Sequence, residues 1–260
     1  MKGIALAEFN KFEHRSPSAQ NLIDIFSGKW ASDFSQVYPG LKAGVADLFM
    51  SDSRPLLAAK YFGTNGRLDG VEVLELGPLE AGHTYRLEQL GATVTAVEAN
   101  CEAYLKCLLV KELLNLRSSR FLLGDFSLFL EETEKNFDLI FASGVLYHMP
   151  DPLRLVELIA KRTEKCFVWS HYYDPDHYPG PKRTPRLVKH RLGNFTYHEL
   201  EYPDMNYGKF WGGNKPIASW LSKDEMLNAF RLFGFDKTEV IEEQTDHPHG
   251  ACMSFVARRS

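Results

Sequence analysis

Two segments place glycine or acidic residues where an apolar run ends. The segment Glu75-Leu76-Gly77-Pro78-Leu79-Glu80-Ala81-Gly82 closes the run at 71–76. Glycine at a turn from strand to helix lets a ligand approach the backbone and the helix N-terminus. Glu98 ends the run at 93–98, about 20 positions after Gly77. A carboxylate at that spacing can accept hydrogen bonds from both hydroxyls of a ribose.

A third segment, Gly124-Asp125-Phe126, follows the next apolar run. Asp125 offers a carboxylate to an exocyclic amine, and the ring of Phe126 can stack on a purine. Each segment alone is compatible with an ordinary turn. Together they predict backbone, ribose and adenine contacts, in that order along the chain.

Two histidines close later runs and are candidate general bases. His148 follows Tyr147, and His171 lies between Ser170 and Tyr172. An imidazole at either place can remove a proton from an acceptor hydroxyl. The alternative is a histidine that bonds to nearby backbone or packs on a ligand. An amine or carboxylate acceptor would need neither as a base.

These residues need a sheet to bring them together. Apolar runs alternate with segments of helical spacing at 71–76, 93–98, 120–125, 137–146 and 166–173. Such alternation predicts parallel strands with helices on both faces, and ligands bind beyond the carboxyl ends of such strands. A capping box at Ser222–Glu225 then opens a helix, and strands follow at 235–242 and 252–258. We therefore predict a doubly wound, Rossmann-like, mostly parallel seven-stranded sheet with a terminal antiparallel hairpin.

Residues 1–70 are predicted to form an N-terminal helical extension, and 71–260 the main domain. Apolar residues recur at helical spacing in two stretches of this extension, namely Leu22, Ile23, Phe26 and Trp30, then Leu48, Phe49, Leu56, Leu57, Tyr61 and Phe62.

The segments VLELGPLEAG, AVEAN, GDF and FDLIFASGVLYHMPDP resemble successive motifs of class I S-adenosylmethionine-dependent methyltransferases. The resemblance covers roughly residues 70–170, and its most specific part is the fourth motif. It implies S-adenosylmethionine as the cofactor. The residues that it implies for cofactor binding are Glu75, Gly77, Gly82, Glu98, Asp125, Phe126, Ser143 and Gly144.

The first motif departs from the family pattern. The usual turn places small residues between its glycines, whereas Pro78, Leu79 and Glu80 stand here. Proline and leucine do not adopt positive φ easily, so we expect a turn of adapted shape.

An insertion at about 172–220 is rich in aromatic residues and is expected to have little regular structure. Its position after the fifth strand puts it above the open end of the sheet, where an acceptor would bind. We predict that Tyr147, Tyr172, Tyr173 and Trp211 contact the acceptor. The alternative is a flap whose rings pack against one another.

Two other motifs allow more than one interpretation. The run 181–191 carries five cations and no carboxylate, which suits phosphate or RNA, although a solvated face is the commoner reason for such a run. In Asp246-His247-Pro248-His249 two histidines and an aspartate offer metal ligands. A turn stiffened by proline is the simpler account, and we predict no metal.

Composition narrows the function further. The 260 residues carry 30 Lys and Arg against 34 Asp and Glu, a net charge of −4, so nucleic acid is not favoured as a partner. Four cysteines without zinc spacing, and no apolar run long enough for a signal or a membrane span, predict a cytoplasmic protein. The leading hypothesis is methyl transfer to a hydroxyl of a sugar or secondary metabolite. The alternatives are an RNA methyltransferase and a non-catalytic cofactor-binding scaffold.

Overall fold

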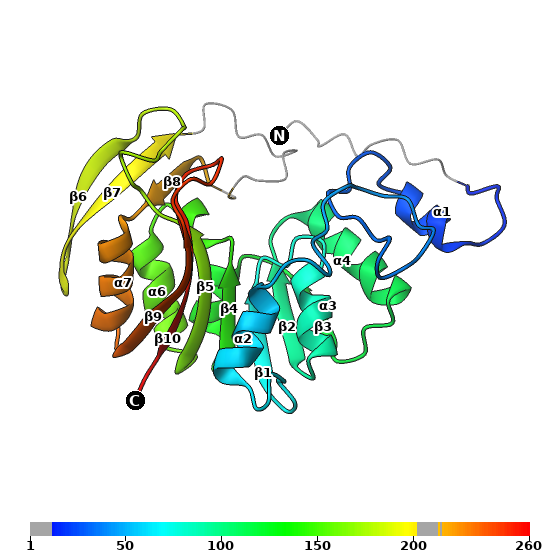
Figure 1. Ribbon diagram of the computed structural model, residues 1–260, viewed down its shortest axis with the longest axis horizontal. Helices are drawn as coiled ribbons and strands as arrows, with labels where there is room; N and C mark the ends of the chain where they lie inside the picture. Colours follow the sequence, from blue (N-terminus) through cyan, green and yellow to red (C-terminus); the bar gives the residue numbers. More distant parts are fainter. Residues whose placement is uncertain (1–11, 202–212, 214) are drawn as a thin grey trace.

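A seven-stranded sheet forms the centre of the computed structural model, which describes residues 12–201, 213 and 215–260 (Figure 1). Its strand order is β3-β2-β1-β4-β5-β10-β9. The strands are β1 (Glu72–Leu76), β2 (Thr93–Glu98), β3 (Ser119–Leu123), β4 (Leu139–Ser143), β5 (Lys165–His171), β9 (Lys237–Gln244) and β10 (Cys252–Arg258). Strands β1 to β5 pair in parallel, and β10 is antiparallel to both β5 and β9. The predicted doubly wound sheet with its terminal hairpin is confirmed.

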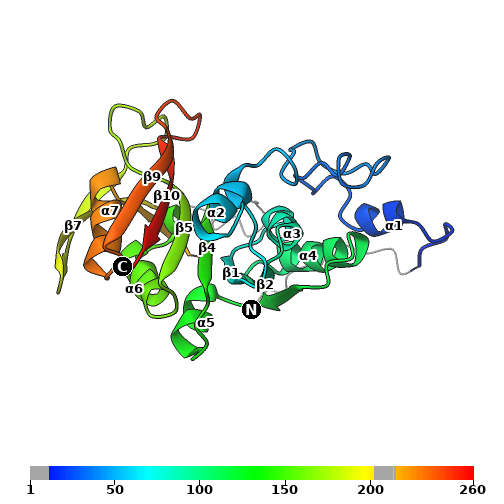
Figure 2. The ribbon, with the colours of Figure 1, turned by 60° about the horizontal axis from the view of Figure 1, so that its bottom comes forward.

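Helices cover both faces of this sheet (Figure 2). On one face lie α2 (Arg54–Phe62), α3 (Gly82–Gln89) and α4 (Cys101–Leu113); on the other lie α5 (Phe126–Glu132), α6 (Pro152–Ala160) and α7 (Lys223–Leu232). A 3-10 turn, η1 (Leu146–His148), follows β4. Among the described residues, no helix is long and apolar enough to cross a bilayer.

Local capping explains where several of these helices begin. The side chains of Asn100, Asp125 and Asp151 accept hydrogen bonds from backbone N–H groups in the first turns of α4, α5 and α6. Ser222 and Glu225 form the predicted capping box at the start of α7. Each cap satisfies amides that have no partner within the helix. Because three of these helices follow parallel strands, their caps gather at one edge of the sheet.

The N-terminal segment is less helical than its apolar spacing predicts. Helix α1 spans only Ala19–Asp24, and the chain turns at Gly28, where φ is +75°. The indole of Trp30 therefore folds back and donates to the carbonyl of Ile23 at 2.8 Å. Trp30 packs edge-on against Phe34 in the core shared with α3 and α4. The periodicity thus marked the buried Ile23, Phe26 and Trp30 correctly, but not the extent of the helix.

The insertion is folded, contrary to the expectation of little regular structure. Strands β6 (Thr184–His190), β7 (Gly193–Glu201) and β8 (Ile217–Trp220) form an antiparallel sheet, seen above α7 in Figure 1. Phe195 and Tyr197 alternate along β7 and are buried against the core of the main sheet. Proline and cations in β6 hid this strand pattern, because a short edge strand can remain polar on both faces.

Candidate active site

In the turn after β1, two residues other than glycine adopt the left-handed backbone conformation. Gly77 has φ of +68°, and Leu79 and Ala81 have φ of +60° and +62°. The expectation that leucine would avoid this region is wrong. A left-handed residue with a side chain costs roughly 1–2 kcal/mol, so neighbouring contacts must hold the turn. One of them is the Leu79 N–H, which donates to a Glu98 carboxylate oxygen at 3.1 Å.

Glu80 supplies the strongest of these contacts. Its buried carboxylate lies 3.0 Å from the ammonium of Lys106 on α4 and accepts from the Ser32 N–H at 2.9 Å. Lys106 also donates to the carbonyl of Lys29 at 2.6 Å. The loop is therefore anchored to the N-terminal segment through a buried ion pair. Sequence analysis missed this role, because nothing in the local pattern links Glu80 to its distant partners.

Glu98 lies at the end of β2 beside this turn and is 8% exposed. One carboxylate oxygen accepts from the Asn100 N–H at 2.8 Å and the other from Leu79. Burial raises the pKa of Glu98, while the backbone donors act in the opposite direction. Each oxygen keeps a second lone pair, so this carboxylate can still accept from ligand hydroxyls.

The third predicted contact point lies at the end of β3, next to β2. The Gly124 N–H donates to the carbonyl of Glu98 at 2.9 Å, and a methyl group added at Gly124 would meet no atom within 4 Å. Asp125 caps α5, and Phe126 is half-buried against the core. The ends of β1, β2 and β3 are thus adjacent and in the order predicted for backbone, ribose and adenine.

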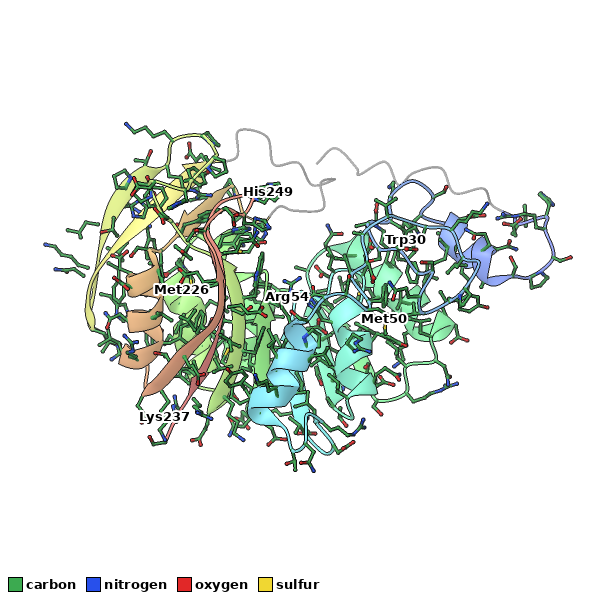
Figure 3. The ribbon with its side chains drawn as sticks, viewed as in Figure 1. Trp30, Met50, Arg54, Met226, Lys237 and His249 are labelled. Carbon is green, nitrogen blue, oxygen red and sulfur yellow. The ribbon has the colours of Figure 1, made fainter. Side chains whose placement is uncertain are left out.

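Arg54 was missed by sequence analysis and lies beside the end of β4. Its guanidinium donates to the Ser143 hydroxyl at 2.8 Å, pairs with Asp52 and lies 4.7 Å from the centre of the Trp169 ring. Figure 3 shows Arg54 in the middle of the molecule, between the two halves of the sheet. Nothing around Arg54-Pro55 distinguishes it from an ordinary first turn of a helix.

A buried acidic network continues below Arg54. Asp52 accepts from His83 Nε2 at 2.9 Å. Burial raises the pKa of Asp52, but hydrogen bonds from His83 and Arg54 outweigh it and hold that pKa well below its usual range. Glu75 is fully buried, and burial raises its pKa to about 8 although Thr84 donates to it. One Glu75 oxygen has no hydrogen-bond partner among the described residues, and this burial favours the protonated, neutral form of the side chain.

The remaining predicted glycines differ in what they do. A methyl group at Gly82 would lie 2.6 Å from the carbonyl oxygen of Leu48, so this glycine admits the N-terminal segment by close packing. Gly144 has φ of +82° and donates its N–H to the carbonyl of Trp169 at 2.9 Å. Gly144 and Ser143 therefore lie at the point where β4 meets β5.

An aromatic cluster stands on the other side of Arg54. The Tyr147 ring packs edge-on against His171, Trp169 and Trp220, with centroids 4.8, 5.9 and 6.0 Å away. His171 and Trp220 are stacked at 5.2 Å. The structure thus brings Tyr147 and His171 together, and adds Trp169 and Trp220.

His171 and His148 both lie in this cluster. The His171 Nδ1 atom faces the carbonyl of Gly250 at 2.8 Å, so it carries the proton and leaves the Nε2 lone pair available. Burial lowers the pKa of His171 to about 4, and that of His148 to about 4 as well. The His148 Nδ1 atom is buried without a hydrogen-bond partner among the described residues. Both rings are neutral at pH 7 and can accept a proton.

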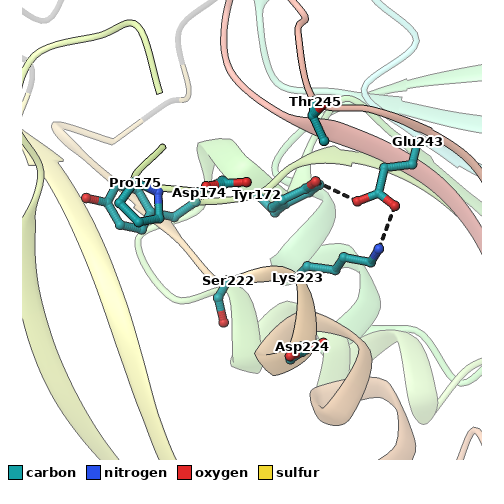
Figure 4. A pocket seen from close by; sticks show the side chains of 9 residues that line it. Tyr172, Asp174, Pro175, Ser222, Lys223, Asp224, Glu243 and Thr245 are labelled. Atoms are coloured by element: carbon teal, nitrogen blue, oxygen red, sulfur yellow. Dashed lines mark hydrogen bonds and ion pairs between the residues drawn. The ribbon is translucent and has the colours of Figure 1, made fainter. Parts of the chain in front are cut away.

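Two predicted acceptor contacts lie elsewhere. Tyr172 faces α6 and α7, on the opposite face of β5 from Trp169, and its hydroxyl donates to Glu243 at 2.6 Å. Tyr173 stacks on His198 at 3.7 Å. Both line a pocket of about 310 Å³ next to Lys223 (Figure 4). Successive residues of a strand point to opposite faces, which separates Tyr172 from His171. Trp211 lies outside the described residues.

The sheet order, the antiparallel last strand and the acidic residue at the end of β2 define a class I, Rossmann-like methyltransferase fold. Residues 74–165 match the family model described as a methyltransferase domain. The match and the fold together support an S-adenosylmethionine-dependent methyltransferase domain in this chain. No match was found among curated proteins.

Solved structures share this fold at low sequence identity. The N-terminal domain of EvdMO1, solved in the presence of SAH and D-fucose, is 22% identical over 93% of this chain and 94% of that chain, with a TM-score of 0.68. TehB from Haemophilus influenzae is 14% identical over 92% of this chain and 67% of that chain, with a TM-score of 0.55. The CcbJ methyltransferase from Streptomyces caelestis is 15% identical over 89% of this chain and 98% of that chain, with a TM-score of 0.54.

Proposed function

We propose that this enzyme transfers a methyl group from S-adenosylmethionine to a hydroxyl of a sugar or a sugar-containing small molecule. One observation carries the proposal: the Arg54 guanidinium bonds to Ser143 and also lies on the Trp169 ring. This contact joins the turn and carboxylates that suit the cofactor to the histidines and rings that suit an acceptor.

The residues present fit the cofactor. Glu98 keeps free lone pairs for the ribose, and Gly124 faces open space near Asp125 and Phe126, where we place the adenine. We assign the amino-acid part to Arg54 and Ser143, because a guanidinium matches a carboxylate in charge and shape. When bound, the cofactor supplies a methyl group already activated by its sulfonium. The protein's own task is to align the acceptor and to remove its proton.

The acceptor side favours a neutral, hydroxylated molecule. Its surface consists of ring faces and uncharged imidazoles. Ring faces pack against the C–H groups of a sugar, and an Nε2 lone pair can accept a hydroxyl proton. The EvdMO1 domain, which shares the fold, was solved in the presence of D-fucose. This supports a sugar as the acceptor class, with His171 and His148 as the candidate bases.

The RNA hypothesis loses its main support. Of the five cations at 181–191, Arg183 is buried against Trp220 at 3.9 Å, and Arg186 pairs with Glu199 at 2.7 Å. The run therefore does not present one continuous cationic face.

The proposal can be tested in two stages with the purified protein. Titration calorimetry should show micromolar binding of S-adenosylmethionine and S-adenosylhomocysteine, with no heat from NAD. Release of S-adenosylhomocysteine is then measured with free deoxysugars, nucleotide-linked sugars, a phenol and an amine. We expect turnover only with sugar hydroxyls. Turnover confined to the phenol or the amine would overturn the acceptor class, and binding without turnover on any acceptor would favour the scaffold hypothesis.

A further inference from the structure

Three potential metal ligands converge at the edge of the aromatic cluster. His171 ends β5, Cys252 begins β10 directly opposite it in the antiparallel register, and His247 lies in the loop before β10. One nitrogen or sulfur atom from each lies within 4.8 Å of the other two. Among the described residues, these three side chains form a group that could hold a metal ion.

We propose that His171, His247 and Cys252 bind one divalent transition-metal ion of the zinc type and leave a fourth coordination position for the acceptor. The metal site stands on this geometry alone, whereas its role toward an acceptor hydroxyl rests on the proposed function.

The donor set suits this class of ion. Zinc prefers imidazole nitrogen and thiolate sulfur at about 2.0–2.3 Å, and catalytic sites combine three protein ligands with one open position. Tetrahedral ligand atoms are then about 3.3–3.8 Å apart. The ligand atoms must close in by about 1 Å, which side-chain rotation can supply. Hard ions such as Mg²⁺ prefer oxygen ligands, which this group lacks.

His171 is already oriented as a ligand would be. Its Nδ1–H points to the carbonyl of Gly250 at 2.8 Å, and its ring is stacked on Trp220. Metal-binding histidines usually donate their second ring N–H to a carbonyl or carboxylate, which sets the tautomer and the ring orientation. The Nε2 lone pair is the one left to coordinate.

The other two ligands impose small costs. His247 is half-buried, and its Nδ1 accepts from the N–H of His249 at 3.1 Å. Coordination through that atom would release the amide of an exposed residue to water. Cys252 is 4% exposed and must lose its proton, which a bound divalent ion readily displaces.

A metal here would change how the acceptor is activated. Both proton acceptance and metal binding use the Nε2 lone pair of His171, so the two roles exclude each other. With the ion bound, the acceptor hydroxyl occupies the fourth position and loses its proton to water. Its oxygen then bonds to the methyl carbon as the carbon–sulfur bond breaks, and that electron pair stays on sulfur.

Cobalt(II) titration of the full chain provides the test, because a cobalt–thiolate bond gives a charge-transfer absorption in the near ultraviolet. We expect one equivalent to bind with this band. Cys252→Ser should abolish the band, and His247→Ala should weaken binding at least tenfold. The matched control is Cys101→Ser, since Cys101 is exposed at the start of α4 and outside the cluster. Circular dichroism confirms that each variant is folded.

Absence of the band in the wild type, or its survival in Cys252→Ser, would overturn the proposal. Calorimetry with S-adenosylhomocysteine on the same preparations separates this result from the proposed function. Loss of the cobalt band in Cys252→Ser with cofactor affinity unchanged supports the metal site. A wild type that binds cobalt but no cofactor would refute the proposed function and leave the metal site standing.

Discussion

The residues on the two sides of Arg54 differ in charge and in the kinds of interaction they can make with a ligand. On one side lies the carboxylate half, which we define as Asp52, Glu75, His83 and Arg54. It contains the Arg54–Asp52 ion pair and is held by specific hydrogen-bond donors and acceptors. On the other side the ring half, defined as Tyr147, Trp169, His171 and Trp220, consists of ring faces and a neutral imidazole. The two halves meet where the Arg54 guanidinium lies on Trp169.

This difference matches what each half is proposed to bind. A cofactor of constant structure can be held by charges and hydrogen bonds in one geometry. An acceptor with many similar hydroxyls is better positioned by ring faces, which set its plane while a lone pair selects one hydroxyl. The comparison therefore predicts that changes in one half leave the ligand of the other half unaffected.

The largest effect is expected from His171→Ala in the ring half. Loss of the group that activates the acceptor hydroxyl should lower kcat by about 10²–10⁴-fold. Cofactor affinity should stay within about twofold of the wild type, because His171 lies in the half away from the cofactor residues. Steady-state kinetics and calorimetry check the two expectations, and an unaltered kcat would leave His171 with a structural role only.

Lys106→Met tests the ion pair with Glu80 that anchors the turn after β1. Removing one partner of a buried ion pair should lower the free energy of unfolding by about 3–5 kcal/mol, because the Glu80 charge stays buried. Adding Glu80→Gln should recover part of that loss. Lys135→Met is the matched control, since its pair with Glu72 is about half exposed and should change stability by about 0–1 kcal/mol. Urea denaturation measures the loss of stability in each variant. Equal losses in Lys106→Met and Lys135→Met would show that the Glu80 pair is solvated.

The pH dependence of stability reports on Glu75. In the folded protein the Glu75 carboxyl keeps its proton up to a pKa of about 8, whereas in the unfolded chain it loses the proton near the ordinary glutamate pKa of 4.5. The folded state thus binds more protons between these values, and Glu75 lowers stability progressively as pH rises through that window. The wild type should lose on the order of 4 kcal/mol relative to Glu75→Gln between pH 4.5 and 8. Thermal melts of both proteins at several pH values measure this loss. A difference in unfolding free energy that stayed constant with pH would refute a protonated Glu75.

Arg54→Gln tests the assignment of the cofactor carboxylate. Losing a charged hydrogen bond of about 1.5–3 kcal/mol should weaken S-adenosylmethionine binding roughly 10- to 100-fold. The wild type should show a similar loss with decarboxylated S-adenosylmethionine, and the variant should no longer distinguish the two ligands. Calorimetry decides this, and a variant that still prefers the carboxylated ligand shows that Arg54 does not contact it. Arg67→Gln, at a surface pair with Asp69, is the control.

The smallest effect is expected from Trp220→Leu. An aromatic contact is worth about 0.5–1.5 kcal/mol beyond its area, so KM for the acceptor should rise no more than about tenfold. Cofactor affinity should be unchanged, since Trp220 lies on β8 in the ring half. A change in cofactor affinity instead of acceptor KM would break the separation of the two halves.

The sequence by itself determined the sheet and the order of the strand ends that carry the candidate ligand residues. Apolar runs have a period that a strand must satisfy locally, and the ends of β1, β2 and β3 were placed correctly from Gly77, Glu98 and Asp125. The same local logic located the α7 capping box. It failed for the insertion, where β6 is largely exposed and its two apolar residues, Leu187 and Val188, are adjacent rather than alternating.

Only the tertiary structure decided which distant residues meet. Arg54 reaches Ser143, Glu80 reaches Lys106, and His171 reaches Cys252 because separate elements pack at one edge of the sheet. The structure also divided neighbours, since Tyr172, which follows the last residue of β5, packs with α6 and α7 and away from the cluster around His171. Periodicity reports burial along one element, whereas long-range partners depend on how elements pack, which short-range spacing does not encode.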